Sequence, residues 1–239
     1  MSNNKLVLIS GGSATGKSYC LHDLKDPTGV MYLNCESNKA LPFNSKFDEY
    51  TVIDPWQVHE AIAHAESMPH IHTIVIDSLT YLLDQFETQY VLTASNGMKA
   101  WSDFAQFFKV MMQQLVANST KNVVVLAHTL SILNEQKMEM ETKVPVKGAL
   151  KNQGIESFFS FVISTKAETV LNLEKKPNNL LIITEDEKED GFKYVFQTRL
   201  TKETIGEKIR GPVGLFSRDE IFIDNNLQNV IERLHTFYT

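Results

Sequence analysis

The chain has 239 residues, 43% of them hydrophobic, so it can bury a sizeable core and does not have the composition of a disordered protein. Its formal net charge of −6 argues against a globally basic nucleic-acid coat but leaves room for a local basic channel. No apolar run approaches the roughly 20 residues that span a bilayer, and the N-terminus lacks the features of a signal peptide. The two cysteines and the scattered histidines lack metal-site spacing. We therefore expect one cytoplasmic domain over residues 1–239, with no membrane segment.

The most specific motif lies near the N-terminus, in the sequence KLVLISGGSATGKSY over residues 5–19. Its apolar residues 6–9 suit a strand buried on both faces, and a glycine-rich turn follows without a linker. The turn fits G-x-x-x-x-G-K-[ST], in which backbone amides and lysine hold phosphates and the hydroxyl ligates Mg²⁺. This is a P-loop, and it predicts that ATP and Mg²⁺ bind here. The predicted nucleotide-binding residues are Gly11, Gly12, Ser13, Ala14, Thr15, Gly16, Lys17, Ser18 and Tyr19.

Strand and helix patterns alternate through the first half of the chain, which is typical of an α/β protein with a mostly parallel sheet. A broad apolar stripe in the last of these helices indicates core packing. The expected elements are helices over 19–25, 56–67, 79–91 and 98–118, and strands over 30–34, 50–53, 72–77 and 122–127.

Two carboxylates follow predicted strands. Asp77 ends the strand 72–77, and in P-loop ATPases such an acid holds Mg²⁺ beside the P-loop hydroxyl. We therefore predict Ser18 and Asp77 as metal ligands. Glu36 follows the strand 30–34, at the sheet edge where ligands bind in open α/β folds. By position alone, Glu36 is either a site residue or a surface acid.

The strand 122–127 leads into His128 and then into a long polar segment. His128 could contact the γ-phosphate, or it could be a hydrogen-bonded structural residue. Residues 130–153 carry spread lysines together with glutamates and lack clear periodicity. A long loop inside a compact domain is uncommon unless it is functional, so we weigh a binding loop against a solvated insertion.

The C-terminal third returns to strand patterns, which predict an antiparallel extension of the sheet. The acidic run over residues 185–191 is expected at a hairpin tip, and a late K-x-R pattern supplies Lys208 and Arg210. The expected elements are strands over 157–165, 180–184 and 192–198 and a final amphipathic helix over about 225–238.

Together these motifs resemble the RecA-like P-loop ATPases. The sequences YVFQTRLTKETIGEKIRGP and IDNNLQNVIERLHTFY are more narrowly similar to the compact phage recombinases of the Sak-type single-strand-annealing class. The resemblance covers almost the whole chain and implies a RecA-like core. It implies that Lys17 holds the triphosphate, that Glu36 polarises the attacking water and that Lys208 and Arg210 act as fingers in a neighbouring subunit's site. The DNA-binding residues implied by loop position and family are Lys143, Lys147 and Lys151.

The function implied by this resemblance is an ATP-dependent recombination protein that binds single-stranded DNA and promotes annealing or strand exchange. Hydrolysis would require Mg²⁺ and be stimulated by DNA, within a homo-oligomeric ring or filament in the cytoplasm, the host's if the protein is phage-encoded. A single-strand binding protein is a further candidate partner. Alternatives are a hexameric helicase or translocase, a small-molecule P-loop kinase and a nucleotide-gated loader with little turnover.

Overall fold

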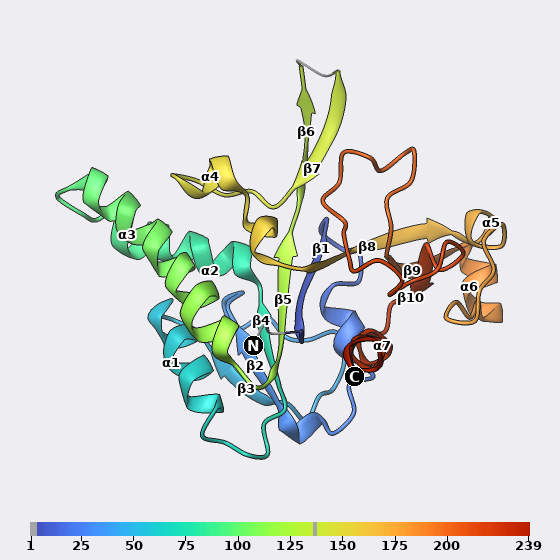
Figure 1. The fold of residues 1–239 in the computed structure, drawn as a ribbon, viewed down its shortest axis with the longest axis horizontal. Coiled ribbons are helices and arrows are strands. Elements are labelled where there is room, and N and C mark those ends of the chain that lie inside the picture. The colour runs from blue at the N-terminus through green and yellow to red at the C-terminus, as the bar shows by residue number, and fades with distance from the viewer. Residues whose placement is uncertain (1–3, 136–137) are drawn as a thin grey trace.

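A computed structural model describes residues 4–135 and 138–239. Its centre is an eight-stranded sheet in the order β10-β9-β8-β1-β5-β4-β2-β3 (Figure 1). The strands from β8 to β3 run parallel, whereas β9 and β10 are antiparallel to their neighbours. The predicted α/β fold, with a mostly parallel sheet and an antiparallel C-terminal extension, is confirmed. The strands are β1 (Leu6–Gly11), β2 (Val30–Asn34), β3 (Asp48–Thr51), β4 (Thr73–Asp77), β5 (Asn122–His128), β8 (Phe161–Thr169), β9 (Phe192–Gln197) and β10 (Phe222–Asp224).

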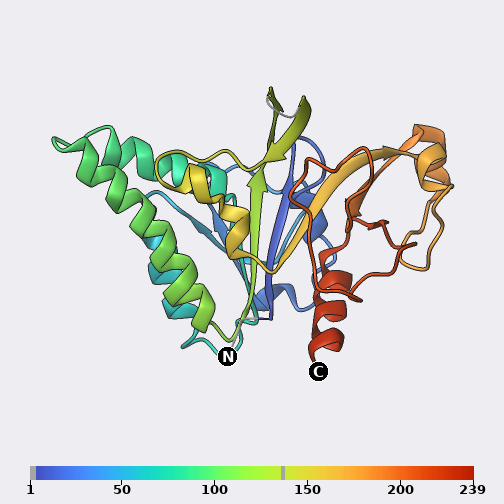
Figure 2. The ribbon, with the colours of Figure 1, turned by 45° about the horizontal axis from the view of Figure 1, so that its top comes forward.

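Helices cover both faces of this sheet, which explains why its central strands read as continuous apolar runs. In β1, Leu8 packs with the helices of one face, while Val7 and Ile9 pack on the other. Figures 1 and 2 show α1, α2 and α3 on one side and α7 on the other. Helices α2 and α3 continue as π-helical turns to Val91 and Val116. The helices are α1 (Trp56–Ala65), α2 (Leu79–Phe86), α3 (Gly97–Val110) and α7 (Leu227–Tyr238).

The segment that follows His128 is more ordered than its sequence predicts. Strands β6 (Leu130–Asn134) and β7 (Glu139–Lys143) form a separate two-stranded sheet, followed by the short helix α4 (Leu150–Gln153). Gln136 and Lys137, within the predicted loop, lie outside the described residues. The hairpin of β6 and β7 stands out from the carboxyl edge of the main sheet (Figure 1).

The prediction that the acidic run forms a hairpin tip is wrong. Residues 185–190 instead form the helix α6 (Glu185–Asp190), and residues 180–184 form no strand. The reason is a capping box: the Thr184 hydroxyl accepts from the Glu187 amide while the Glu187 carboxylate accepts from the Thr184 amide. Strand β9 therefore pairs with β8 and β10 instead of with the segment before α6.

Two further boundaries differ from the expectation. The predicted P-loop helix is only a 3₁₀ turn, Ser18–Leu21, before the chain turns towards β2. Strand β8 starts later than predicted because a 3₁₀ turn, Ile155–Phe158, precedes it, and it ends at the short helix α5 (Val170–Leu173). In the part of the chain that the structure describes, no helix has the length and apolarity to cross a membrane.

Candidate nucleotide-binding site

The carboxyl ends of the parallel strands open into a cavity of about 650 Å³. The P-loop lines one wall of this cavity, and Glu36, Asp77 and His128 come to it from the ends of three other strands. This is the edge of an open α/β sheet at which ligands bind. The fold thus brings the predicted P-loop, metal and water-polarising residues, which are far apart in the sequence, into one cavity.

Two P-loop positions require glycine. A Cβ at Gly11 would lie 2.1 Å from the Thr165 hydroxyl oxygen, since β8 passes directly beside the loop. Gly16 has a φ of +89°, and a Cβ there would lie 2.5 Å from the Asn225 side-chain nitrogen. The glycines therefore let the loop backbone turn sharply against two other segments of the chain.

Lys17 lies folded over the loop. Its ammonium donates to the carbonyl oxygens of Gly11 at 3.2 Å and Gly12 at 2.5 Å, and the residue is only 6% exposed. Burial lowers the pKa of Lys17, against the opposing attraction of Asp77 and Glu36. Lys17 lines the cavity, so its side chain can turn from the loop carbonyls to the oxygens of a bound polyphosphate.

Ser18 and Asp77 are in direct contact. The Ser18 hydroxyl donates to one Asp77 carboxylate oxygen at 2.8 Å, and the Tyr32 hydroxyl donates to the same oxygen at 2.8 Å. The other Asp77 oxygen, Oδ1, is buried without a hydrogen-bond partner. Burial raises the pKa of Asp77 above its ordinary value, although both hydroxyl donors oppose the shift.

This pair fits a magnesium ion. A hydroxyl and a carboxylate with an unpartnered oxygen are hard oxygen ligands, and Mg²⁺ is usually held by one or two carboxylates together with substrate phosphates and water. Among the described residues, no group of three or more His, Cys, Asp or Glu side chains is arranged to hold a metal ion by itself. Ser18 and Asp77 would thus hold an ion that arrives with the nucleotide.

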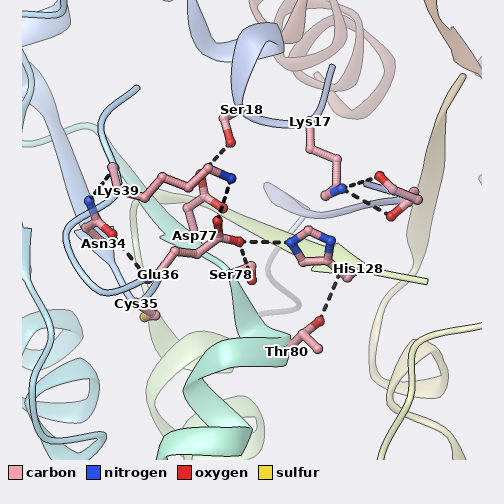
Figure 3. A network of polar contacts seen from close by, with 12 residues as sticks. Lys17, Ser18, Asn34, Cys35, Glu36, Lys39, Asp77, Ser78, Thr80 and His128 are labelled. Carbon is pink, nitrogen blue, oxygen red and sulfur yellow. Dashed lines mark hydrogen bonds and ion pairs between the residues drawn. The ribbon is translucent and has the colours of Figure 1, made fainter. Parts of the chain in front are cut away.

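Glu36 is held in place by three side chains (Figure 3). One carboxylate oxygen accepts from His128 Nε2 and from the Ser78 hydroxyl, each at 2.9 Å, and the other accepts from Lys39 at 3.1 Å. The hydrogen bond from His128, followed by those from Lys39 and Ser78, lowers the pKa of Glu36 to about 2 against the effect of burial. Glu36 is therefore ionised at neutral pH, in a position fixed by its neighbours.

His128 joins this carboxylate to the segment that follows β5. Its side chain bonds Glu36, while its backbone amide donates to the Thr80 hydroxyl at 2.9 Å. Its ring also meets the Tyr81 ring edge to face, with centroids 5.7 Å apart. His128 thus connects the nucleotide cavity to the start of α2 and to the hairpin of β6 and β7.

The C-terminal segment closes one side of the cavity, which the sequence did not indicate. Asn225 donates to the Gly16 carbonyl at 2.8 Å, and Asn226 donates to an Asp23 carboxylate oxygen at 2.9 Å. These contacts tie the start of α7 to the P-loop turn, across more than 200 positions of sequence. Lys39, Ser78 and Tyr32 were also missed as site residues, although the position of Ser78 directly after Asp77 was a local signal.

The predicted finger residues do not line this cavity. Lys208 pairs with Glu141 of β7 at 2.7 Å, and the Arg210 guanidinium donates to the backbone carbonyls of Glu156 and Phe159. Lys208 and Arg210 instead line a separate groove of about 490 Å³. In this chain they therefore lie away from the P-loop of their own site.

The predicted DNA-binding lysines lie beyond His128. Lys147 pairs at 2.7 Å with Glu87, which begins the π-helical turn after α2, and Lys143 pairs with Glu141 at 3.2 Å. Lys151 is an exposed residue of α4. All three lysines line one groove of about 550 Å³ that borders the nucleotide cavity, since Ser13 and His128 line both.

A comparison with protein families agrees with this geometry. The model of a family described as AAA domain matches residues 3–206, which is most of the chain. No curated protein matches the chain. The matched region contains the P-loop, Glu36, Asp77 and His128, whereas Asn225 and α7 lie beyond it. With a P-loop at the edge of a mostly parallel sheet, the chain belongs to the AAA domain family and is a P-loop ATPase.

Proposed function

We propose that this ATPase is a recombination protein that binds single-stranded DNA and promotes annealing or strand exchange, as its resemblance to the Sak-type class implies. The observation that best supports the proposal is the continuity between His128 and the lysine-lined groove. His128 bonds Glu36 in the nucleotide cavity and also lines the groove with Lys143, Lys147 and Lys151. A strand bound there would lie next to the residue that holds Glu36.

The residues of the nucleotide cavity take separate roles in the proposed ATPase step. Lys17 and the loop amides bind the triphosphate, and Ser18 and Asp77 would hold Mg²⁺, which would neutralise charge on the phosphates. Glu36 orients the attacking water and accepts its proton. In the conformation described here Glu36 is bonded to His128, Ser78 and Lys39, so hydrolysis requires at least part of this network to release its oxygens.

The active assembly is a homo-oligomer, a ring or a filament, in which each site is completed by its neighbour. This part of the proposal is supported by the separation of Lys208 and Arg210 from the cavity of their own chain. A cation inserted in trans is worth about 10³–10⁵ in rate in related systems, so the isolated chain would hydrolyse ATP slowly. We further propose that residues 1–239 act as one RecA-like domain in the cytoplasm, with a single-strand binding protein as a candidate partner.

The DNA-binding part of the proposal is tested by replacing Lys143, Lys147 and Lys151 together with alanine. Phosphate contacts dominate affinity for single strands, so we expect weaker binding of a labelled oligodeoxythymidylate and a shallower dependence of affinity on salt. The matched control replaces three exposed lysines outside the groove, Lys46, Lys99 and Lys202. Unchanged affinity and salt dependence in the groove variant would refute this function.

The same preparation separates the proposal from a motor function. A hexameric helicase would share the ATPase residues, but it would unwind a forked duplex in one direction. We expect purified protein to anneal complementary strands or exchange them, without directional unwinding. Unwinding that depends on ATP hydrolysis would contradict the recombination assignment and leave the ATPase site intact.

A further inference from the structure

The groove beside the nucleotide cavity has an apolar wall and a basic rim. Helix α2 forms one side, and the other side is formed by β6 and the chain that follows β7. Leu130 and Ile132 of β6 contribute apolar surface, and each is 53% exposed. Sites for single-stranded nucleic acid combine a cationic groove with aromatic rings on which bases stack, and aliphatic surface beside them can pack against the bases.

Tyr81 places an aromatic ring in this groove. It lies on the first turn of α2, lines the groove and is 45% exposed. Its ring meets His128 edge to face at 5.7 Å with an angle of 68° between the rings. Tyr81 is thus open to a ligand and also in contact with the residue that bonds Glu36.

The charges around the ring favour a polyanion. Two of the three lysines in the groove are held by ion pairs: Lys143 with the half-exposed Glu141, and Lys147 with Glu87, whose side chain is only 12% exposed. An exposed ion pair contributes little to stability, so a phosphate can replace Glu141 on Lys143 at little cost. The Lys147 side chain is 63% exposed, so its ammonium can also reach a phosphate. Among the described residues that line the groove, three lysines stand against two acids, Asp84 and Glu87.

We propose that Tyr81 stacks on a base of single-stranded DNA and reports this contact to Glu36 through His128. The inference rests on the proposed function, since it assigns a contact and a signalling route to the same DNA site. The Thr80 hydroxyl holds the His128 backbone, so a displacement of the Tyr81 ring is taken up by the imidazole. Movement of the imidazole loosens its 2.9 Å bond to Glu36 and leaves that carboxylate oxygen with Ser78 as its remaining donor, so the oxygen can accept from a water.

The test compares Tyr81→Ala with Tyr81→Phe and Tyr81→Trp. Stacking on an aromatic ring is worth roughly tenfold in affinity per base, so the alanine variant should bind a labelled oligodeoxythymidylate about tenfold more weakly. At saturating DNA its ATPase rate, relative to its own rate without DNA, should also fall. The Phe and Trp variants keep a stacking surface and should retain affinity and stimulation close to those of the wild-type protein.

Two controls separate stacking from a structural effect. Tyr50→Ala removes a tyrosine that is 42% exposed and whose hydroxyl bonds one neighbouring acid, on the edge strand β3 outside the groove. An oligonucleotide of abasic sites keeps the phosphates and removes the bases. We expect Tyr50→Ala to behave as wild type, and the abasic strand to bind wild type and Tyr81→Ala equally.

The outcomes are distinguishable. If the wild-type protein binds no single-stranded DNA, the proposed function itself fails. If the wild-type protein binds DNA and is stimulated by it, but Tyr81→Ala is unchanged in both respects, the assignment of Tyr81 is overturned. It is also overturned if Tyr81→Ala loses the same affinity for the abasic strand, or if Phe and Trp fail to restore binding.

Discussion

Replacing Glu36 with glutamine should separate nucleotide binding from hydrolysis. The side chain of Glu36 is only 8% exposed, and its carboxylate accepts from His128, Ser78 and Lys39. Glutamine has almost the same volume, and its carbonyl oxygen can still accept from one of these donors. The substitution therefore keeps the shape of the site but removes the negative charge that we propose orients and deprotonates water.

The expected effect follows from the role of a positioned base. General-base catalysis contributes typically about 10²–10⁴-fold, so kcat should fall by at least about a hundredfold, or roughly 2.7 kcal/mol of transition-state stabilisation. Affinity for ATP should be unchanged or tighter, because the substitution removes a carboxylate from a cavity that receives a polyanion. A loss of rate without a loss of binding is the signature of a residue that acts in the transition state.

The assay pairs single-turnover ATP hydrolysis in Mg²⁺ with equilibrium titration of a fluorescent nucleotide. Glu49→Gln is the matched control, since Glu49 accepts a hydrogen bond from Asn34 of β2 but lies outside the cavity. We expect this control to hydrolyse ATP at the wild-type rate. If Glu36→Gln keeps its hydrolysis rate within about threefold, less than 1 kcal/mol, the assignment of Glu36 is wrong.

Three further predictions address the same site. The pKa of Glu36 is lowered to about 2 from an unfolded value of 4.5, so the stabilisation by its carboxylate is full above about pH 4.5 and is lost as the pH falls towards 2. In acid unfolding across this pH range, the unfolding free energy of Glu36→Gln should therefore fall less than that of the wild-type protein. Asn225→Ala removes the hydrogen bond to Gly16 and should cost about 0.5–1.5 kcal/mol of unfolding free energy and weaken ADP binding, measured by thermal melts with and without ADP; an unchanged melt would contradict the contact. Lys208→Ala and Glu36→Gln should each be inactive alone but regain part of the wild-type ATPase rate when mixed, because a Glu36→Gln subunit supplies Lys208 to the intact Glu36 of a Lys208→Ala subunit. If the co-assembled variants recover no activity, Lys208 does not act in the neighbouring subunit's site.

The parts of the site that the sequence predicts are those encoded by local patterns. The P-loop is contiguous in sequence, and Asp77 ends an apolar strand, so the residues next to each of them were enough to predict both. The alternation of strands and helices gave the parallel sheet, because buried strands and amphipathic helices have different apolar periods. The position of Glu36 after β2 suggested a site residue. Its hydrogen bonds to His128 and Ser78 could not be predicted, because they depend on the sheet order, in which β4 lies between β2 and β5.

The missed features depend on contacts between distant segments. Asn225 reaches Gly16 only because β9 and β10 return the chain to the P-loop before α7 begins. Tyr32 looks like an ordinary strand residue until its hydroxyl meets Asp77 from the neighbouring strand. The helix α6 was missed for a different reason, since its Thr184 and Glu187 capping box is a local signal that the acidic composition obscured.

We propose that the nucleotide cavity and the lysine-lined groove beside it act together, through contacts that meet at His128. The most direct test is the rate of Mg²⁺-dependent ATP hydrolysis by the wild-type protein with and without single-stranded DNA, measured together with the mass of the particle formed. We predict that DNA raises the hydrolysis rate and that the particle contains several copies of the chain. A hydrolysis rate that DNA does not change, measured for a protein that stays monomeric, would contradict the proposed coupling between the two sites.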